Sequence, residues 1–113
     1  MVRVQAIMGI IRDCDLEKME DANFMQVMIE RTVKLMDLTL LKTVSHKFTP
    51  QGLTTVALLS ESHIAIDTYP EEKLMLVDVI SCGQKDAKIV LDIMEDMLGG
   101  ITEIIFDKMI EGN

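Results

Sequence analysis

The stretch that decides the fold runs from residue 53 to residue 80 and reads LTTVALLSESHIAIDTYPEEKLMLVDVI. It contains three apolar runs rich in Val, Ile, Leu and Thr, the residue types typical of strands, over residues 53–60, 63–69 and 74–80. Only two to four residues separate one run from the next. Connections this short join antiparallel neighbours. The stretch therefore predicts three consecutive antiparallel strands.

The segments on either side of this stretch complete an α+β pattern. Further strands are expected over residues 2–11, 38–48 and 102–110. Two segments instead repeat their apolar residues every three or four positions, which predicts amphipathic helices over residues 16–36 and 85–98. The order predicts a single domain over residues 1–113, a two-layer sandwich in which two helices cover one face of an antiparallel sheet.

The apolar residues also suggest an interface between two copies of the chain. Two helices can cover only one face of such a sheet. Within residues 74–80 and 104–110, however, apolar residues occupy both alternation phases, which is typical of strands buried on both faces. We therefore expect a homodimer in which the two sheets face each other and the helices lie outside.

Composition excludes several classes of function. Among the 113 residues, 19 acidic residues outnumber 11 basic ones, and the net charge of −8 repels nucleic-acid phosphate. Aromatic residues make up only 4% and Trp is absent, which argues against a base-stacking surface. No apolar run approaches the roughly 18 to 20 residues that span a bilayer, and the start of the chain does not resemble a secretory signal. We expect a cytoplasmic protein that binds neither nucleic acid nor membrane.

The cysteines and histidines do not form a metal-ligand pattern. Cys14 and Cys82 lie far apart, and neither His46 nor His63 has a ligand-like spacing to them. Neither a disulfide framework nor a metal site is expected. Taken alone, each cysteine is expected to be a buried, inert thiol.

Polar groups are concentrated over residues 60–71, SESHIAIDTYPE, at the junction of two predicted strands. Ordinary turn chemistry accounts for the first three of these residues. Strand alternation places Ser62 on one face and both His63 and Asp67 on the other. A Ser-His-Asp triad is therefore not expected here, because side chains along one strand do not stack in that order.

This stretch resembles the hallmark of the small prokaryotic S-adenosylmethionine decarboxylase proenzymes, which reads approximately SESHxxIHTWPE and is followed by TCG. Here Ser81-Cys82-Gly83 stands at the corresponding separation. Upstream, residues 46–52, HKFTPQG, are similar to the family's HxFxPxG. Asp13-Cys14-Asp15 is similar to its (E/G)CD. On these motifs the chain is identified as a member of that family.

The resemblance implies a pyruvoyl-dependent decarboxylase that serves polyamine (spermidine) synthesis. In that family the hydroxyl of the serine corresponding to Ser62 attacks the carbonyl corresponding to that of Glu61. Elimination then leaves a pyruvoyl group at the start of the larger fragment. The ketone forms a Schiff base with S-adenosylmethionine and accepts the electrons released when carbon dioxide leaves. The implied cofactor is therefore made from the chain itself, and no metal is expected.

The resemblance also assigns roles to other residues. Cys82 corresponds to the family's acid, which returns a proton to the former α-carbon of the substrate. Thr54 stands where the family has a serine that assists self-cleavage, and it keeps a hydroxyl. Phe48 corresponds to a ring that stacks on adenine, and Glu71 to a carboxylate that contacts the substrate.

Several positions depart from the family's pattern. Asp67 stands where the family has the histidine linked to the proton abstraction that completes self-cleavage. An ordinary Asp has a pKa of about 3.9 against about 6.5 for His, so it is the weaker base, although burial would raise the Asp value. Tyr69, also expected to bind substrate, replaces a tryptophan, and the family's YGYA becomes EKLM over residues 72–75.

Three functions stay open on the sequence alone. The first is a working S-adenosylmethionine decarboxylase, favoured by Thr54, Cys82 and the Glu61–Ser62 pair. The second is a family member with altered chemistry, which decarboxylates another amino acid such as arginine or acts on S-adenosylmethionine differently. The third is a non-catalytic or unprocessed paralogue that binds a ligand or regulates an active relative. Asp67 favours the second and third.

Overall fold

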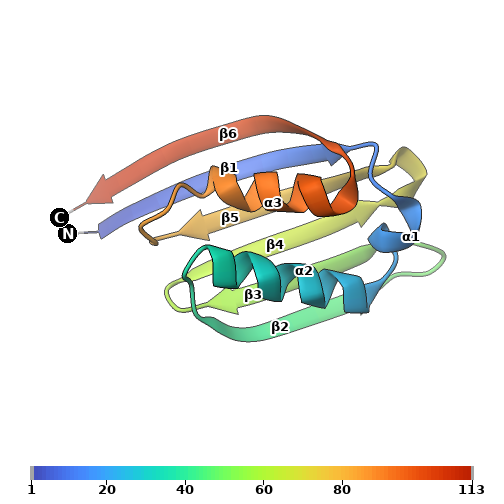
Figure 1. Ribbon diagram of the computed structural model, residues 1–113, viewed down its shortest axis with the longest axis horizontal. Coiled ribbons are helices and arrows are strands. Elements are labelled where there is room, and N and C mark those ends of the chain that lie inside the picture. The colour runs from blue at the N-terminus through green and yellow to red at the C-terminus, as the bar shows by residue number, and fades with distance from the viewer. Residues whose placement is uncertain (1, 113) are drawn as a thin grey trace.

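The computed structural model describes residues 2–112 and contains one six-stranded antiparallel sheet with helices on one face (Figure 1). The strands are β1 (Val2–Arg12), β2 (Leu40–Lys47), β3 (Leu53–Leu59), β4 (Ser62–Tyr69), β5 (Leu74–Ser81) and β6 (Ile101–Gly112). The helices are α1 (Leu16–Met19), α2 (Ala22–Leu35) and α3 (Lys88–Leu98), and a 3-10 turn, η1 (Pro70–Glu72), precedes β5. The predicted two-layer α+β architecture is confirmed.

The sheet is built around the three strands that the central stretch of sequence predicts. Its order is β2-β3-β4-β5-β1-β6, so β3, β4 and β5 are neighbours in space as in sequence. Leu59 lies opposite Ser62, and Tyr69 lies opposite Leu74. The two connections are therefore tight hairpins at opposite ends of the sheet, as Figure 1 shows.

Strand alternation separates a core face from an open face. Along β4 and β5 every second side chain is buried beneath the helices, and the others are half-buried or exposed. The core is rich in methionine, whose flexible thioether fills irregular gaps between helix and sheet. Its fully buried methionines include Met19, Met25, Met28, Met75 and Met94. Met25, Met28 and Met94 lie on the buried faces of α2 and α3.

The single helix predicted over residues 16–36 is wrong, because the chain breaks at Glu20–Asp21 into α1 and α2. Asp15 caps α1 by accepting a hydrogen bond from the backbone N–H of Lys18. Asp21 caps α2 by accepting from the backbone N–H groups of Asn23 and Phe24. Two capped starts in one segment specify two helices, and apolar periodicity alone does not detect the break.

The last helix, α3, begins at Lys88 rather than near residue 85. The carboxylate of Asp86 accepts a hydrogen bond from the backbone N–H of Lys88 at 3.0 Å and so marks the start of the helix. This bond, followed by one from the side chain of Gln5, lowers the pKa of Asp86 below its ordinary value. Residues 82–87 therefore form a loop in front of α3.

The open face of the sheet is apolar and uncovered in a single chain. Its exposed apolar side chains include Met8, Val56, Leu58, Phe106 and Ile110. The edge strand β6 is exposed along almost its whole length, so the expected burial of residues 104–110 on both faces is not found within one chain. The reason is its position at the edge of the sheet, beyond β1. Within residues 2–112, no helix is both long and apolar enough to cross a membrane.

Candidate active site

Three of the predicted site residues meet at the end of the sheet where β4 begins and β5 ends. Because these strands are antiparallel neighbours, Ser62 lies next to Cys82, which follows β5. The Ser62 hydroxyl oxygen lies 3.4 Å from the Cys82 sulfur and accepts a hydrogen bond from the Cys82 backbone N–H at 3.1 Å. The Cys82 thiol also lies 3.6 Å from the carbonyl oxygen of Glu61. We call Glu61, Ser62 and Cys82 the serine–cysteine cluster.

The cluster has a buried and an exposed side. Ser62 is buried, with 6% of its surface exposed, on the core face of β4. Because its oxygen accepts the N–H of Cys82, its own proton is free to be donated elsewhere. Glu61 lies in the exposed turn, with its carboxylate 3.9 Å from the Cys82 sulfur. A hydroxyl, a thiol and a peptide carbonyl therefore meet at a point that solvent reaches from one side.

The other five predicted site residues gather at the opposite end of the sheet. They line a hollow of about 350 Å³ between the β2–β3 turn and the β4–β5 connection. The residues that line it are Phe48, Gln51, Gly52, Thr54, Asp67, Thr68, Tyr69 and Glu71. We call this the distal hollow. The structure thus divides the predicted site into two parts.

Polar contacts hold two side chains of the distal hollow in place. Thr54 and Asp67 are directly opposite each other on β3 and β4, and the Thr54 hydroxyl donates to the Asp67 carboxylate at 2.5 Å. The Gln51 amide donates to the Glu71 carboxylate at 2.6 Å. The hollow therefore offers two carboxylates beside the rings of Phe48 and Tyr69.

The wall of the distal hollow is anchored by a residue that sequence reasoning missed. The carboxylate of Glu20, at the break between α1 and α2, accepts the backbone N–H of Gly52 at 2.9 Å. The carbonyl of Gly52 in turn accepts the N–H of Phe48 at 2.8 Å, which closes the turn. Glu20 precedes Gly52 by 32 residues, and no local pattern links them. Gln51 was missed as well, since it falls at a variable position of the motif.

The two parts of the site do not meet within one chain. Strand β4 is regular from Ser62 to Tyr69, and the side chains of Ser62 and Asp67 lie on opposite faces. Five residues of strand separate them by roughly 16 Å. Asp67 therefore does not reach residue 62 of its own chain, and its role in self-cleavage stays a prediction that a single chain does not satisfy. Thr54, bonded to Asp67, is equally remote.

Cys14 has the environment of an inert thiol. It is buried, and its thiol donates to the carbonyl of Ile11 at 3.3 Å. Burial, with a smaller contribution from the charge of Asp13, raises the pKa of Cys14 to about 11. Its backbone N–H donates to the carbonyl of Lys73, so the Asp13-Cys14-Asp15 motif joins the end of β1 to the start of β5.

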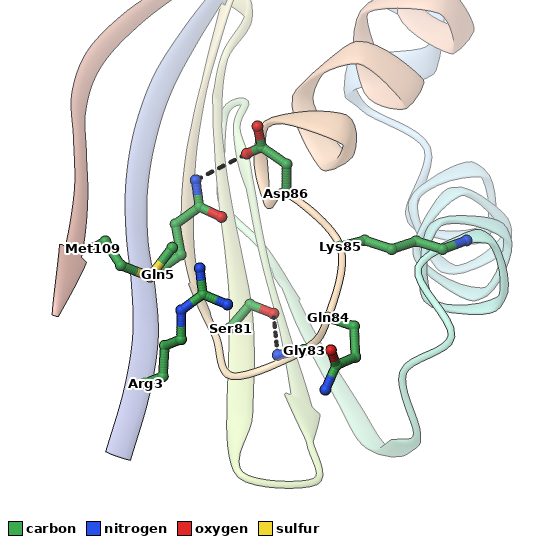
Figure 2. Close-up of a pocket in the computed structure, with 8 residues that line it drawn as sticks. All are labelled: Arg3, Gln5, Ser81, Gly83, Gln84, Lys85, Asp86 and Met109. Carbon is green, nitrogen blue, oxygen red and sulfur yellow. Dashed lines mark hydrogen bonds between the residues drawn. The ribbon is translucent and has the colours of Figure 1, made fainter. Parts of the chain in front are cut away.

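A second hollow, of about 260 Å³, lies beside the loop that carries Cys82 (Figure 2). Behind it, the buried Gln5 amide donates to the carboxylates of Asp86 at 2.9 Å and Asp107 at 3.0 Å, and its oxygen accepts the N–H of Ala87. The Ser81 hydroxyl accepts the N–H of Gly83 at 3.1 Å. These bonds hold both ends of the loop. Among residues 2–112, no group of three or more His, Cys, Asp or Glu side chains is arranged to hold a metal ion.

Known proteins of one family match most of this chain. The profile of the S-adenosylmethionine decarboxylase family matches residues 5–105. The chain belongs to this family. A protein of Geobacillus kaustophilus, named S-adenosylmethionine decarboxylase proenzyme, is 35% identical over 89 residues, which cover 79% of this chain and 72% of that protein. The resemblance seen in the sequence motifs is thus confirmed for the family.

Further relatives of the family match over part or all of the fold. A proenzyme of the same name from Synechococcus sp. (strain WH7803) is 46% identical over 71 residues, or 63% of this chain. The matched region spans 56% of that protein's length. The crystal structure of the adenosylmethionine decarboxylase from Aquifex aeolicus superposes with a TM-score of 0.82 and 28% identity, covering 97% of this chain and 90% of that one.

Proposed function

We propose that this chain is a proenzyme that cleaves itself between Glu61 and Ser62 and then decarboxylates S-adenosylmethionine for polyamine synthesis. The observation that carries the proposal is the serine–cysteine cluster, in which the Ser62 hydroxyl adjoins the peptide bond to be cleaved and lies 3.4 Å from the Cys82 thiol. Membership of the family and the names of the relatives support the same reaction.

Self-cleavage uses the chain's own atoms. The Ser62 oxygen attacks the carbonyl carbon of Glu61, the carbon–nitrogen bond breaks, and the hydroxyl proton passes to the freed nitrogen, which leaves an ester. A base then removes the α-hydrogen of residue 62, and the Glu61 carboxylate departs. Water hydrolyses the resulting enamine after it tautomerises to the imine, and ammonia leaves. The product is a pyruvoyl group at residue 62, made from the backbone and side-chain atoms of Ser62 itself.

The pyruvoyl group supplies an electron sink for the electrons released as carbon dioxide leaves. The chain's own residues provide the rest of the site. The Cys82 thiol lies next to residue 62 and is positioned to return a proton to the former α-carbon of a substrate held there. The loop that carries the thiol is held by hydrogen bonds to the side chains of Ser81 and Gln5.

We further propose that two copies pair through their open faces. Apolar side chains cover that face in a single chain. A two-fold axis that reverses the strand direction places opposite ends of the two sheets together. The start of each β4 then lies beside the distal hollow of the other copy, and Asp67 and Thr54 of the second copy approach residue 62 from the open face of the strand, opposite to its side chain. This accounts for two halves of one site at opposite ends of one chain.

The distal hollow suits a cationic substrate that carries an aromatic ring. Asp67 and Glu71 attract the sulfonium and ammonium charges of S-adenosylmethionine, and Phe48 and Tyr69 provide rings for the adenine. Arginine also carries positive charges that the two carboxylates attract, but it has no nucleobase to stack on the two rings. Replacing Phe48 with Ala therefore weakens use of S-adenosylmethionine and spares that of arginine.

A second candidate is the unprocessed paralogue, which Asp67 favours. This carboxylate accepts the Thr54 hydroxyl at 2.5 Å, and carboxylates are weaker bases than imidazole near neutral pH. In that case the chain keeps the Glu61–Ser62 bond and acts by binding a ligand or an active relative.

Intact mass after purification separates the two candidates. Self-cleavage yields fragments of residues 1–61 and 62–113, the second one with a pyruvoyl end. The decarboxylase then releases labelled carbon dioxide from carboxyl-labelled S-adenosylmethionine, with labelled arginine as the comparison. A single stable species of 12.7 kDa without carbon dioxide release supports the paralogue instead.

A further inference from the structure

We propose that the backbone of Glu61 is held in a strained conformation that promotes the attack of Ser62 on the Glu61 carbonyl. The inference rests on the self-cleavage proposed above. Glu61 has a φ of 60°, in the left-handed region. Residues other than Gly and Asn adopt this region at a cost, because Cβ approaches the carbonyl oxygen that follows it. Glu61, whose left-handed conformation carries this cost, directly precedes the peptide bond to be cleaved.

The hairpin leaves this turn no room to relax. Leu59 and Ser62 are paired directly, so only Ser60 and Glu61 reverse the chain. The N–H of Ser60 donates to the carbonyl of Thr39 at 3.0 Å, which fixes the first side of the turn. The N–H of Cys82 holds the Ser62 oxygen on the second side. Glu61 is the second of the two turn residues, and a turn with positive φ at this position usually places Gly or Asn there.

The acyl shift removes the cause of the strain. In the peptide, the nitrogen alone joins the Glu61 carbonyl carbon to the Ser62 α-carbon. In the ester, Oγ and Cβ join them, so the link is one atom longer. The longer turn no longer requires a positive φ at Glu61. Strain that is present in the precursor and absent from the ester favours the ester, and strain of this kind often gathers at functional sites.

Three substitutions of Glu61 test this idea in the full chain. Ala keeps the penalty of the left-handed region, Asn lowers it, and Gly removes it. We expect the rate of fragment appearance at pH 7 to 8 to fall in the order Ala, Asn, Gly, with Gly at least about five-fold slower than Ala. All three lack the carboxylate near Cys82, so its loss does not affect the comparison.

Lys73 provides a matched control at the opposite end of the sheet. Its φ of 52° is also left-handed, at the end of η1. Lys73→Ala and Lys73→Gly are expected to cleave at equal rates. In chains that also carry Ser62→Ala and cannot cleave, Gly should raise the melting temperature relative to Ala at both positions, which measures the strain itself.

The outcomes separate this inference from the proposed function. A Glu61→Gly chain that cleaves as fast as Glu61→Ala, or an Asn chain equal to Ala, overturns the inference and leaves self-cleavage intact. Equal slowing by Gly at positions 61 and 73 also overturns it, because the effect is then one of general stability. A parent chain that never cleaves overturns self-cleavage and this inference together.

Discussion

The hydroxyl of Ser62 and the thiol of Cys82 lie 3.4 Å apart although 20 residues separate them in the chain. The pair exists because β4 and β5 are antiparallel neighbours, so that the start of one strand meets the end of the other. The backbone N–H of Cys82 also binds the Ser62 oxygen at 3.1 Å. One residue therefore contacts Ser62 through two groups, and substitutions can separate their effects.

Ser62→Ala should abolish self-cleavage, because it removes the oxygen that attacks the Glu61 carbonyl. Cys82→Ala keeps the backbone N–H, so we expect cleavage to continue. Because the variant lacks the thiol that returns a proton to the substrate, we expect decarboxylation to turn over more slowly or to give an incorrectly protonated product. Fragment time courses and product analysis measure the two effects. Cleavage that persists in Ser62→Ala would show that a different bond is cut, and loss of cleavage alone in Cys82→Ala would make the thiol a processing residue.

Asp67→His should speed self-cleavage at pH 7 to 8, because imidazole is a competent base in this range. Asp67→Asn, which can neither accept the proton nor carry the charge, serves as the control and should be slower than the parent chain. The measurement is the appearance of fragments over time. If the parent chain cleaves fast and histidine does not increase the rate, then either the Asp67 carboxylate already acts as the base or another group does.

Mixing two inactive chains tests whether the site is shared between copies. Ser62→Ala keeps Asp67, and Asp67→Ala keeps Ser62. If each cluster uses Asp67 of the other copy, co-refolded mixtures should cleave the Asp67→Ala chain and leave the Ser62→Ala chain whole. Mass spectrometry identifies which chain is cut. If both variants are folded and neither is cleaved in the mixture, the site is not shared between copies.

A charge on the open face should separate the copies. Phe106→Asp places a carboxylate at a side chain that is 49% exposed in one chain, and Val27→Asp does the same on α2, where the side chain is 56% exposed. Sedimentation at micromolar protein should give about twice the 12.7 kDa chain mass for the parent and Val27→Asp, and a monomer for Phe106→Asp. A parent chain that sediments as a monomer would contradict the dimer.

Glu20→Ala should raise KM for S-adenosylmethionine several-fold and leave kcat nearly unchanged, because it frees the turn that carries Phe48 and Gln51. Glu20→Gln should restore KM, since its amide oxygen still accepts the N–H of Gly52. Glu17→Ala, on α1 just before Glu20, is the control and should behave like the parent. An unchanged KM in Glu20→Ala would show that the turn holds its shape without this bond.

The thiol of Cys14 should make the fold less stable in alkali. Its pKa rises from 9.0 to about 11 on folding, so the folded chain binds the proton more tightly than the unfolded chain. The contribution of this thiol to the free energy of unfolding is complete below pH 9 and is lost as the pH rises toward 11. Urea unfolding from about pH 8 to 11 should show a fall in the free energy of unfolding that is smaller in Cys14→Ala. An equal fall in both chains would contradict this assignment.

Local patterns in the sequence predict most of the fold. Runs rich in Val, Ile, Leu and Thr within residues 53–80, joined by short connections, predict three antiparallel strands, and alternate side chains on a strand face opposite sides. The same argument places Ser62 and Asp67 on opposite faces, as the structure shows. The break at Glu20–Asp21 could not be predicted from apolar periodicity, since the apolar stripe continues across it and only the cap at Asp21 marks it.

The sequence by itself determined which residues match the family's motifs and that Ser62 and Asp67 lie on opposite faces of one strand. Only the tertiary structure decided which of them meet. Ser62 touches Cys82, and Thr54 touches Asp67, because of the pairing and register of whole strands. The distance between these two pairs follows from the length of β4, which holds them at opposite ends of one sheet. Contacts across strands depend on sheet order, and sheet order results from packing the whole chain around one core.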